Sequence, residues 1–214
     1  MSSHNIWYII SGIGLSLQYT ILSLIIGTAI GLYIAILRQN SSKVTTHIIN
    51  FYISILRGTP LLVQLMLIYF AIPALLEINI SGYFAGLIAF SLNSSAYLAE
   101  IFRAGMQSIP QEQFDSCKTL KIPNFLMMKD IILPQAIRNS LPALVNETTS
   151  LLKETAIIST IGEADIMRRA HIVAVENYSY FTPLIIAAIC YYILVLIITK
   201  AGDTLEHRLY HDKY

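Results

Sequence analysis

Long apolar runs dominate the sequence and indicate its architecture. Four stretches carry no charged residue and are each about as long as a membrane-spanning helix: residues 5–37, 58–76, 78–99 and 177–199. A fifth, Ser140–Gly162, is apolar apart from Glu147, Lys153 and Glu154. An α-helix needs roughly 20 consecutive apolar residues to cross the hydrocarbon core of a bilayer. The pattern therefore predicts an all-α integral membrane protein with about five transmembrane helices.

The composition supports a membrane protein and argues against several other classes. Only 13% of the 214 residues are charged and the mean hydropathy is +0.62, whereas charged residues make up about a quarter of a soluble domain. The first apolar run lacks a basic leader and is too long for a signal peptide, so we expect it to stay in the membrane. Two cysteines imply no disulfide framework, and a net charge of +1 gives no indication of nucleic acid. We predict a single membrane domain over residues 1–214.

The basic residues predict which ends of the spans face the cytoplasm, because cytoplasmic loops carry the excess of lysine and arginine. With the N-terminus outside, eleven of the 14 basic residues fall in cytoplasmic segments: Arg38, Lys43, Arg57, Arg103, Lys118, Lys121, Lys129, Arg138, Lys200, Arg208 and Lys213. The outer side holds Arg168 and Arg169, and Lys153 falls within a span. We therefore expect a periplasmic N-terminus and a cytoplasmic C-terminus.

The segment before the second apolar run, VTTHIINFYISILRGTP, has a helical pattern of its own. Ile48, Phe51, Tyr52 and Ile55 recur at helical spacing, which is typical of an amphipathic helix. We expect this helix to lie along the inner membrane surface or to extend the second span inward. A plain loop is the alternative.

A polar block, QEQFDSCKTLKIPNFLMMKDIILPQAI, interrupts the apolar sequence at residues 111–137. Phe114 and Cys117 share one face of a first predicted helix, and a second apolar face follows between Pro123 and Pro134. Proline disrupts a helix interior but is tolerated at its start, so these prolines are expected to bracket the second helix. The pattern predicts two short amphipathic helices joined by a tight turn. Such helices lie on lipid or dock into a partner's groove, and both possibilities fit the block.

The block resembles the EAA loop in permease subunits of ATP-binding cassette importers. In that loop Glu-Ala-Ala is followed by three residues, Gly, nine residues, Ile, one residue and Leu-Pro. The same spacing falls here on Asp115, Ser116, Cys117, Lys121, Ile131, Leu133 and Pro134. Asp115 keeps the charge of the family's Glu, and two small residues stand for its alanines. Lys121 replaces the glycine, and a lysine with positive φ in that turn would cost about 1–2 kcal/mol.

Three further segments extend the resemblance over about residues 10–205. RGTPLLVQLMLIYFAIP, AYLAEIFRAGMQSIP and LPALVNETTSLLKETAIISTIGEADIMRRA are similar to stretches of permeases for histidine, glutamine, glutamate and arginine. The resemblance implies the type I importer permease fold, with a transmembrane core at about residues 12–205 and a coupling loop at about 110–134. It also implies the bacterial inner membrane as location, and glutamine is the expected solute on overall likeness.

The same resemblance implies the partners. A periplasmic solute-binding protein would deliver the amino acid, and a second permease subunit, identical or related, would complete the path through the bilayer. An ATPase subunit would grip the loop through six positions: Asp115, Ser116, Cys117, Lys121, Leu133 and Pro134. The sequence contains no GxxxxGK[ST] phosphate loop, in agreement with ATP being handled by a partner. We expect no enzymatic activity, no cofactor and no metal site.

Polar and ionisable residues within the spans are candidates for the solute path, because charges at membrane depth usually face a cavity or a partner. The candidates are Gln64, Tyr97, Glu100, Arg103, Glu147 and Glu154. Glu147 and Glu154 lie seven residues apart, and so about 20° apart around a helix. For Glu100 and Arg103, a local ion pair or a surface anchor competes with binding of the solute's carboxylate.

Other functions are compatible with parts of the sequence. An importer for a different solute fits the coupling loop equally well, because the loop reports only the ATPase partner. An intramembrane enzyme could use the carboxylates, but the sequence has no evident nucleophile–base pair and no HExxH or GxSxG pattern. A membrane scaffold without transport would leave Glu147 and Glu154 without a role.

Overall fold

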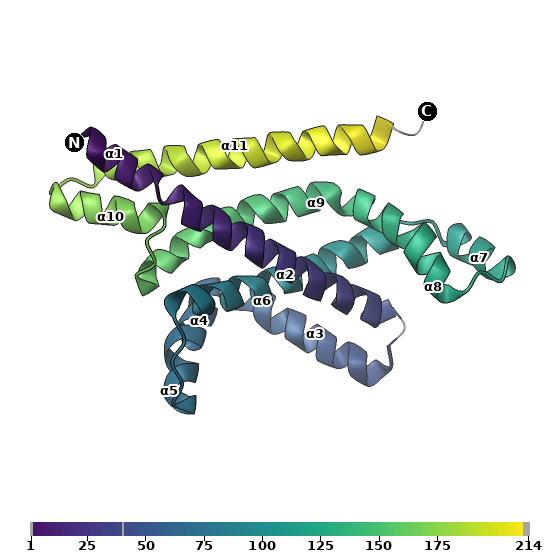
Figure 1. Cartoon of the computed structure of the whole chain (residues 1–214). Helices are drawn as coiled ribbons and strands as arrows, with labels where there is room; N and C mark the ends of the chain where they lie inside the picture. The colour runs from purple at the N-terminus through teal and green to yellow at the C-terminus, as the bar shows by residue number, and fades with distance from the viewer. Residues whose placement is uncertain (1, 40, 212–214) are drawn as a thin grey trace.

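The computed structural model describes residues 2–39 and 41–211, and every regular element within these ranges is a helix. Lys213 of the topology prediction lies outside them. The α-helices are α1 (Ser3–Ile10), α2 (Ile13–Gln39), α3 (Lys43–Gly58), α4 (Leu61–Met66), α5 (Ile72–Leu76), α6 (Gly82–Gln107), α7 (Gln111–Thr119), α8 (Asn124–Leu126), α9 (Leu133–Glu154), α10 (Ile166–Glu176) and α11 (Phe181–His211). In Figure 1, α2, α6, α9 and α11 run along a bundle, with α1 and the end of α11 at opposite ends.

The predicted all-α membrane fold is confirmed, and its spans differ in regularity. Three helices of the described residues are long and apolar enough to cross a membrane: Ser3–Arg38, Gly82–Gln107 and Phe181–Arg208. A fourth span exists if Lys43–Gly58 and Leu61–Leu76 are taken together across their bend. The fifth predicted span corresponds to α9, which packs against α6 and α11 in the same bundle. Its composition is more polar than that of the other spans because it carries Glu147, Lys153 and Glu154.

The apolar stretch that the sequence predicts over residues 58–76 is helical from Leu61 to Leu76, with a π segment at Leu67–Ala71, and a sharp bend separates it from α3. The amphipathic helix α3 forms, but it packs against α6, where Ile53 lies buried beside Ala96 and Ala99. The chain then turns by 102° before the next helical segment. Thr59 is extended at this break, as expected for a residue that precedes a proline.

Small residues bring the backbones of α2 and α6 close together. Gly27 and Gly31, four residues apart on α2, face the serine-rich side of α6. A Cβ atom at Gly31 would lie 2.8 Å from the carbonyl oxygen of Ser95 and 2.9 Å from the nitrogen of Ala99. Helix pairs in membranes associate through such small-residue contacts, since burial of apolar surface gives little gain in lipid.

Both π-helical segments of the described residues precede a proline: Leu67–Ala71 comes before Pro73, and Met127–Ile132 before Pro134. A proline lacks the N–H group and its ring clashes with the carbonyl four residues earlier. The wider π turn accommodates that carbonyl. The sequence pattern predicts that Pro134 ends a separate short helix, and this prediction is wrong. Instead, α8, the π segment and α9 follow one another without a break.

Candidate functional site

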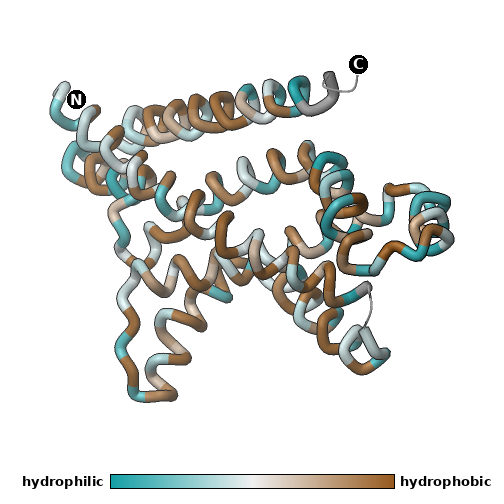
Figure 2. Tube along the Cα trace, turned by 45° about the vertical axis from the view of Figure 1, so that its right-hand side comes forward, coloured by the Kyte–Doolittle hydropathy of each residue, from teal (hydrophilic) through white to brown (hydrophobic). Residues whose placement is uncertain are grey.

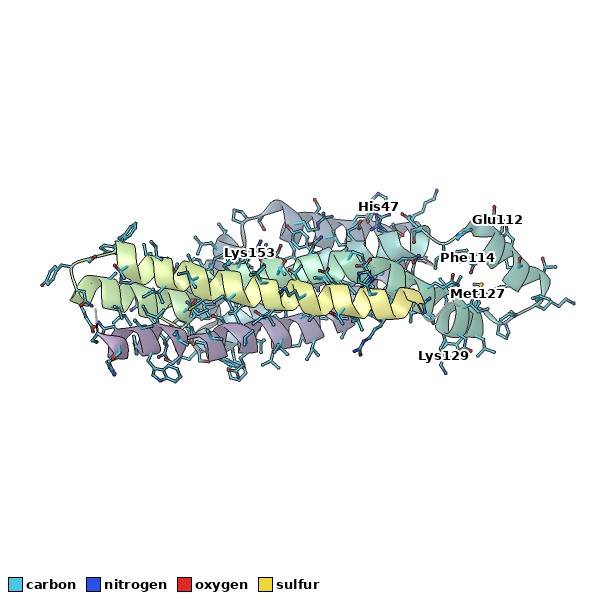
Figure 3. All side chains as sticks on the ribbon, turned by 90° about the horizontal axis from the view of Figure 1, so that it is seen from above. His47, Glu112, Phe114, Met127, Lys129 and Lys153 are labelled. Carbon is cyan, nitrogen blue, oxygen red and sulfur yellow. The ribbon has the colours of Figure 1, made fainter. Side chains whose placement is uncertain are left out.

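The polar block forms a projection at one end of the bundle, built from α7, α8 and the π segment (Figure 1). Its inner side continues a hydrophobic core of the bundle, because Cys117 and Met127 are buried in one cluster with Phe102 and Met106 of α6. Figure 3 shows Phe114 and Met127 close together in this projection. The two predicted amphipathic helices therefore hold each other by their apolar sides and leave their polar sides free.

The outer side of α7 is acidic and hollowed. Glu112, Asp115 and Ser116 line a shallow pocket of about 550 Å³ with Thr119 and Leu120. The Asp115 side chain is 62% exposed and lies 3.7 Å from Lys118 Nζ, a distance at which an exposed pair contributes little. Of the predicted coupling residues, Asp115 and Ser116 thus share an accessible surface, whereas Cys117 faces the core.

Lys121 occupies the turn after α7 with a left-handed backbone, at φ +54°. The Ile122 N–H donates to the Cys117 carbonyl at 3.0 Å, and the Lys121 N–H donates to the Lys118 carbonyl at 2.9 Å. These two bonds define a Schellman motif, whose left-handed position is usually glycine. The positive φ that the sequence analysis considered for the lysine in this turn is present.

Replacing Lys121 by glycine is expected to stabilise the protein. The change relieves about 1–2 kcal/mol of left-handed strain but adds about 0.5–1 kcal/mol of chain entropy to the unfolded state, so the net gain is between zero and about 1.5 kcal/mol. Thermal unfolding in detergent measures it. Lys121→Ala is the matched control, because it removes the charge and keeps the Cβ atom. Equal melting temperatures for the two variants would contradict the explanation.

A polar track follows the contact between α6 and α9. Its wider part is a pocket of about 510 Å³ whose polar lining comes from Arg57, Tyr97, Glu100, Arg103, Ser108, Asn139 and Ser140. Asn139 Nδ2 donates to Ser108 Oγ at 2.8 Å and ties the two helices together. Beyond the pocket, Ser94 Oγ donates to Glu147 Oε1 at 3.0 Å. The structure therefore places the predicted residues Tyr97, Glu100 and Arg103 in one pocket, with Glu147 farther along the same helix contact.

Glu100 joins two helices through two arginines. Its Oε1 lies 2.5 Å from Nη1 of Arg38 on α2, and its Oε2 lies 2.6 Å from Nη2 of Arg103. The local ion pair that the sequence suggested is present, and Arg38 is a partner that sequence spacing could not reveal. Arg103 is 32% exposed and also lines the pocket, and its Nη1 donates to Gln107 Oε1 at 2.5 Å.

Four polar residues of this pocket were not among the predicted solute-path residues: Arg57, Ser108, Asn139 and Ser140. Arg57 adds a charge, and it lies at the C-terminal end of α3, a helix length from Lys43. Its guanidinium carbon is 5.0 Å from the centre of the Tyr97 ring, within the range of a cation–π interaction. Only the path of α3 back along the bundle brings Arg57 to the pocket.

Gln64 is buried, and its amide holds the break between α3 and α4. Its Nε2 donates to the carbonyl oxygens of Leu56 and Thr59 at 2.8 and 3.1 Å, and its Oε1 accepts from Asn93 at 3.2 Å. These bonds satisfy carbonyls that the helix end leaves free. A role for Gln64 in the solute path stays a prediction, and the same holds for Glu154, which is half-buried at the end of α9.

At the opposite end of the bundle, hydrogen bonds from two helices converge on Asp165, which is fully buried. Asp165 caps α10 by accepting from the Arg168 N–H at 2.8 Å, and Tyr191 of α11 donates to its other oxygen at 3.0 Å. Burial raises the pKa of this carboxyl above its usual range. Arg169 bonds to Ser11 Oγ at 2.7 Å, so α1, α10 and α11 are joined here by polar contacts.

A family model matches residues 27–210 of the chain, and its description is binding-protein-dependent transport system inner membrane component. The chain belongs to this family. The expectation of a transport permease in the inner membrane is thereby confirmed at the level of the family.

Curated relatives of the permease span nearly its whole length. A putative glutamine transport system permease protein of Rickettsia typhi is 52% identical over 204 residues, which are 95% of this chain and 94% of the relative. An arginine transport system permease protein of Bacillus subtilis is 43% identical over 202 residues, covering 94% and 92% of the two chains. Both relatives are transport permeases rather than enzymes.

Solved structures show the same fold. The permease matches a chain of an amino acid ABC transporter described with histidines at a TM-score of 0.87 and 42% identity, with 94% of each chain covered. It also matches a chain of the inward-facing MetNI methionine ABC transporter at a TM-score of 0.86 and 18% identity, over 97% and 99% of the two chains. The second likeness shows the fold alone. The expected type I importer permease fold is confirmed.

Proposed function

We propose that this permease carries a polar amino acid inward across the bacterial inner membrane, with glutamine as the first candidate. The relative named for glutamine transport is 52% identical over nearly the whole chain. The observation in the structure that carries the proposal is the polar track between α6 and α9. It sets arginine and glutamate side chains along a helix contact inside a largely apolar bundle.

A free amino acid is a zwitterion, so a path for it needs acceptors for an ammonium group and donors for a carboxylate. Arg57 and Arg103 supply cationic donors in the pocket, and Glu147 supplies a carboxylate beyond it. Charged groups at this depth are costly unless water or a ligand reaches them. A second permease subunit would close the open side of the track.

Transport needs energy from an ATPase subunit, and α7 is suited to bind that subunit. Its acidic outer surface projects from the end of the bundle, while its inner side is continuous with the core that contains α6. An ATPase subunit that binds Asp115 and Ser116 would therefore move α6 and α9 when it moves α7. In this arrangement the coupling loop and the C-terminus are cytoplasmic, and the N-terminus faces the periplasmic binding protein.

Arginine is the second candidate solute. A relative named for arginine transport is 43% identical over nearly the whole chain, and Glu147 and Glu154 add negative charge to α9 that would suit a cationic side chain. The two candidates differ by one positive charge on the solute, which makes them separable by competition.

Uptake into proteoliposomes tests the proposal. The permease is reconstituted with its ATPase and binding protein, and uptake of radiolabelled glutamine is measured against unlabelled arginine, histidine, glutamate and alanine. We expect ATP-dependent glutamine uptake on which alanine has little effect. Stronger uptake of arginine would replace glutamine by the second candidate. An absence of ATP-dependent uptake for all of these amino acids would contradict the proposed function.

A further inference from the structure

A second pocket, of about 280 Å³, lies between α2, α3 and α6. The described residues that line it are Ala35, Arg38, Thr46, Arg103 and Gln107. Each stands within about one helical turn of the end of α2, the start of α3 or the end of α6. Figure 3 places His47 of α3 toward the projection that carries Glu112 and away from Lys153. The pocket therefore lies at the end of the bundle from which α7 projects.

Two arginines share one carboxylate beside this pocket. Glu100 contacts Arg38 Nη1 at 2.5 Å and Arg103 Nη2 at 2.6 Å, so the three side chains together carry one positive charge. Gln107 Oε1 accepts from Arg103 Nη1 at 2.5 Å and leaves that charge unchanged. Each guanidinium has five N–H donors, and one carboxylate with one amide oxygen cannot occupy the donors of both. The group therefore keeps positive charge and donors for an anion.

The start of α3 adds positive charge at the same end. Lys43 is its first residue and is exposed. Its first turn contains no acidic residue, and the N–H groups at a helix start carry partial positive charge. Ser42 accepts from one of them, the Thr45 N–H. The potential around the pocket therefore favours a negatively charged ligand.

The outer face of α3 is apolar and uncovered. Val44, Ile48, Phe51 and Ile55 recur at helical spacing and are 45–70% exposed. This face begins next to the pocket, because Val44 and Ile48 flank Thr46 in the first turns of the helix. A phosphate ion would use only the arginines, whereas a phospholipid combines a phosphate with acyl chains that cover an apolar face. The combination of the two surfaces favours the phospholipid.

Helix α11 indicates where the hydrocarbon region ends on this side of the bundle. Its exposed residues include Ile193 and Ile197, and from Lys200 onward they include Asp203 and Arg208. Figure 2 shows the middle of α11 in the colour of hydrophobic residues and hydrophilic residues toward its C-terminal end. In Figure 1 that end and the α7 projection lie on the same side. We therefore expect the pocket at the depth of lipid headgroups.

We propose that this pocket binds the headgroup phosphate of an anionic phospholipid, with Arg38 and Arg103 as its cationic donors and the outer face of α3 against its acyl chains. Basic pockets between transmembrane helices on the cytoplasmic side suit such headgroups. A lipid bound there contacts α2, α3 and α6 together and so stabilises their packing. The site does not depend on which solute is transported, and only its assignment to the cytoplasmic leaflet uses the orientation given under the proposed function.

Thermal unfolding of the purified permease in detergent micelles tests the site. Melting temperatures are compared without additive, with phosphatidylglycerol, with phosphatidylethanolamine of the same acyl chains, and with inorganic phosphate. A ligand that binds only the folded state raises the melting temperature, and we expect phosphatidylglycerol to raise it by about 5 °C or more. Phosphatidylethanolamine, which has no net charge, and inorganic phosphate, which has no acyl chains, are expected to raise it by less than about half as much.

Arg38→Gln removes one of the two cationic donors at a position that does not line the pocket of the polar track. We expect this variant to lose most of the gain from phosphatidylglycerol, measured against its own melting temperature without lipid. Arg208→Gln is the matched control, since it removes an exposed arginine near the C-terminal end of α11 and should keep the gain. Thr46→Leu narrows the pocket without touching the ion pairs and should lose the gain, which provides a test if Arg38→Gln does not fold.

Four results would overturn the inference. An equal gain with phosphatidylethanolamine would show a general effect of lipid, and an equal gain with inorganic phosphate would assign the pocket to a free anion. Equal losses in Arg38→Gln and Arg208→Gln would mean that the total surface charge attracts the lipid. A full gain in Arg38→Gln, or in Thr46→Leu where that variant replaces it, would place the lipid elsewhere. None of these results bears on solute uptake, so the transport proposal stands or fails separately.

Discussion

Asp115→Arg is expected to abolish solute uptake while the permease remains folded in the membrane. The carboxylate is largely exposed on the acidic side of α7 and makes only a weak contact with Lys118, so its loss removes little stability. A partner that binds this surface must complement its negative charge, and a reversed charge there opposes docking. We expect ATP-dependent uptake in proteoliposomes to fall to background and the stimulation of ATP hydrolysis by the loaded binding protein to disappear.

Asp130→Arg is the matched control. It makes the same change of charge in the same polar block, at an exposed position that does not line the α7 pocket. We expect uptake by this variant to remain within about a factor of two of the wild type, as is usual for exposed substitutions away from a contact. If Asp115→Arg supports normal uptake and normal stimulation of ATP hydrolysis, the coupling role of Asp115 is wrong.

Gly31→Leu is expected to prevent stable packing of α2 against α6. A Cβ atom at this position would come within 3 Å of backbone atoms of Ser95 and Ala99, and no side-chain rotation can relieve a clash with backbone. The two helices would have to separate along the pair that forms the centre of the bundle. We expect a loss of about 3 kcal/mol or more, seen as a much lower melting temperature and aggregation during purification in detergent.

Gly14→Leu makes the same substitution near the start of the same helix. A Cβ atom there meets no atom within 4 Å, and leucine favours a helix over glycine by somewhat less than about 1 kcal/mol. We expect its melting temperature to equal or slightly exceed that of the wild type. A similar loss for both variants would mean that any large residue in α2 is harmful, and that the contact of Gly31 with α6 has no special role.

Much of the site followed from local pattern. The polar block forms two helices and a turn because its apolar residues recur at helical spacing, and Lys121 is strained because its place in the turn requires positive φ. The ion pair of Glu100 with Arg103 is likewise local, at a separation of one helical turn. Local sequence is sufficient in these cases because the interacting groups are fixed by the geometry of a single helix or turn.

The contacts that the sequence did not predict join segments that are far apart in the chain. Arg57 reaches Tyr97, and Arg38 reaches Glu100, only because α2 and α3 both pack against α6. The residue at which a helix ends near Pro134 depends on whether a π turn can accommodate the proline. The packing of the surrounding core determines whether that turn forms. Spacing along the sequence contains no information about such pairs.

The sequence by itself determined that the chain is an all-α membrane protein with a polar loop whose spacing resembles that of a permease coupling loop. Uncharged runs of sufficient length and the spacing of the loop residues are enough for that, because a bilayer admits few backbone structures. Only the tertiary structure decided which polar residues meet and which stay uncovered. The chain turns by 102° between α3 and α4, and Arg57 meets Tyr97 and Glu100 in one pocket, because the packing of α3 against α6 brings together residues that are far apart in the sequence.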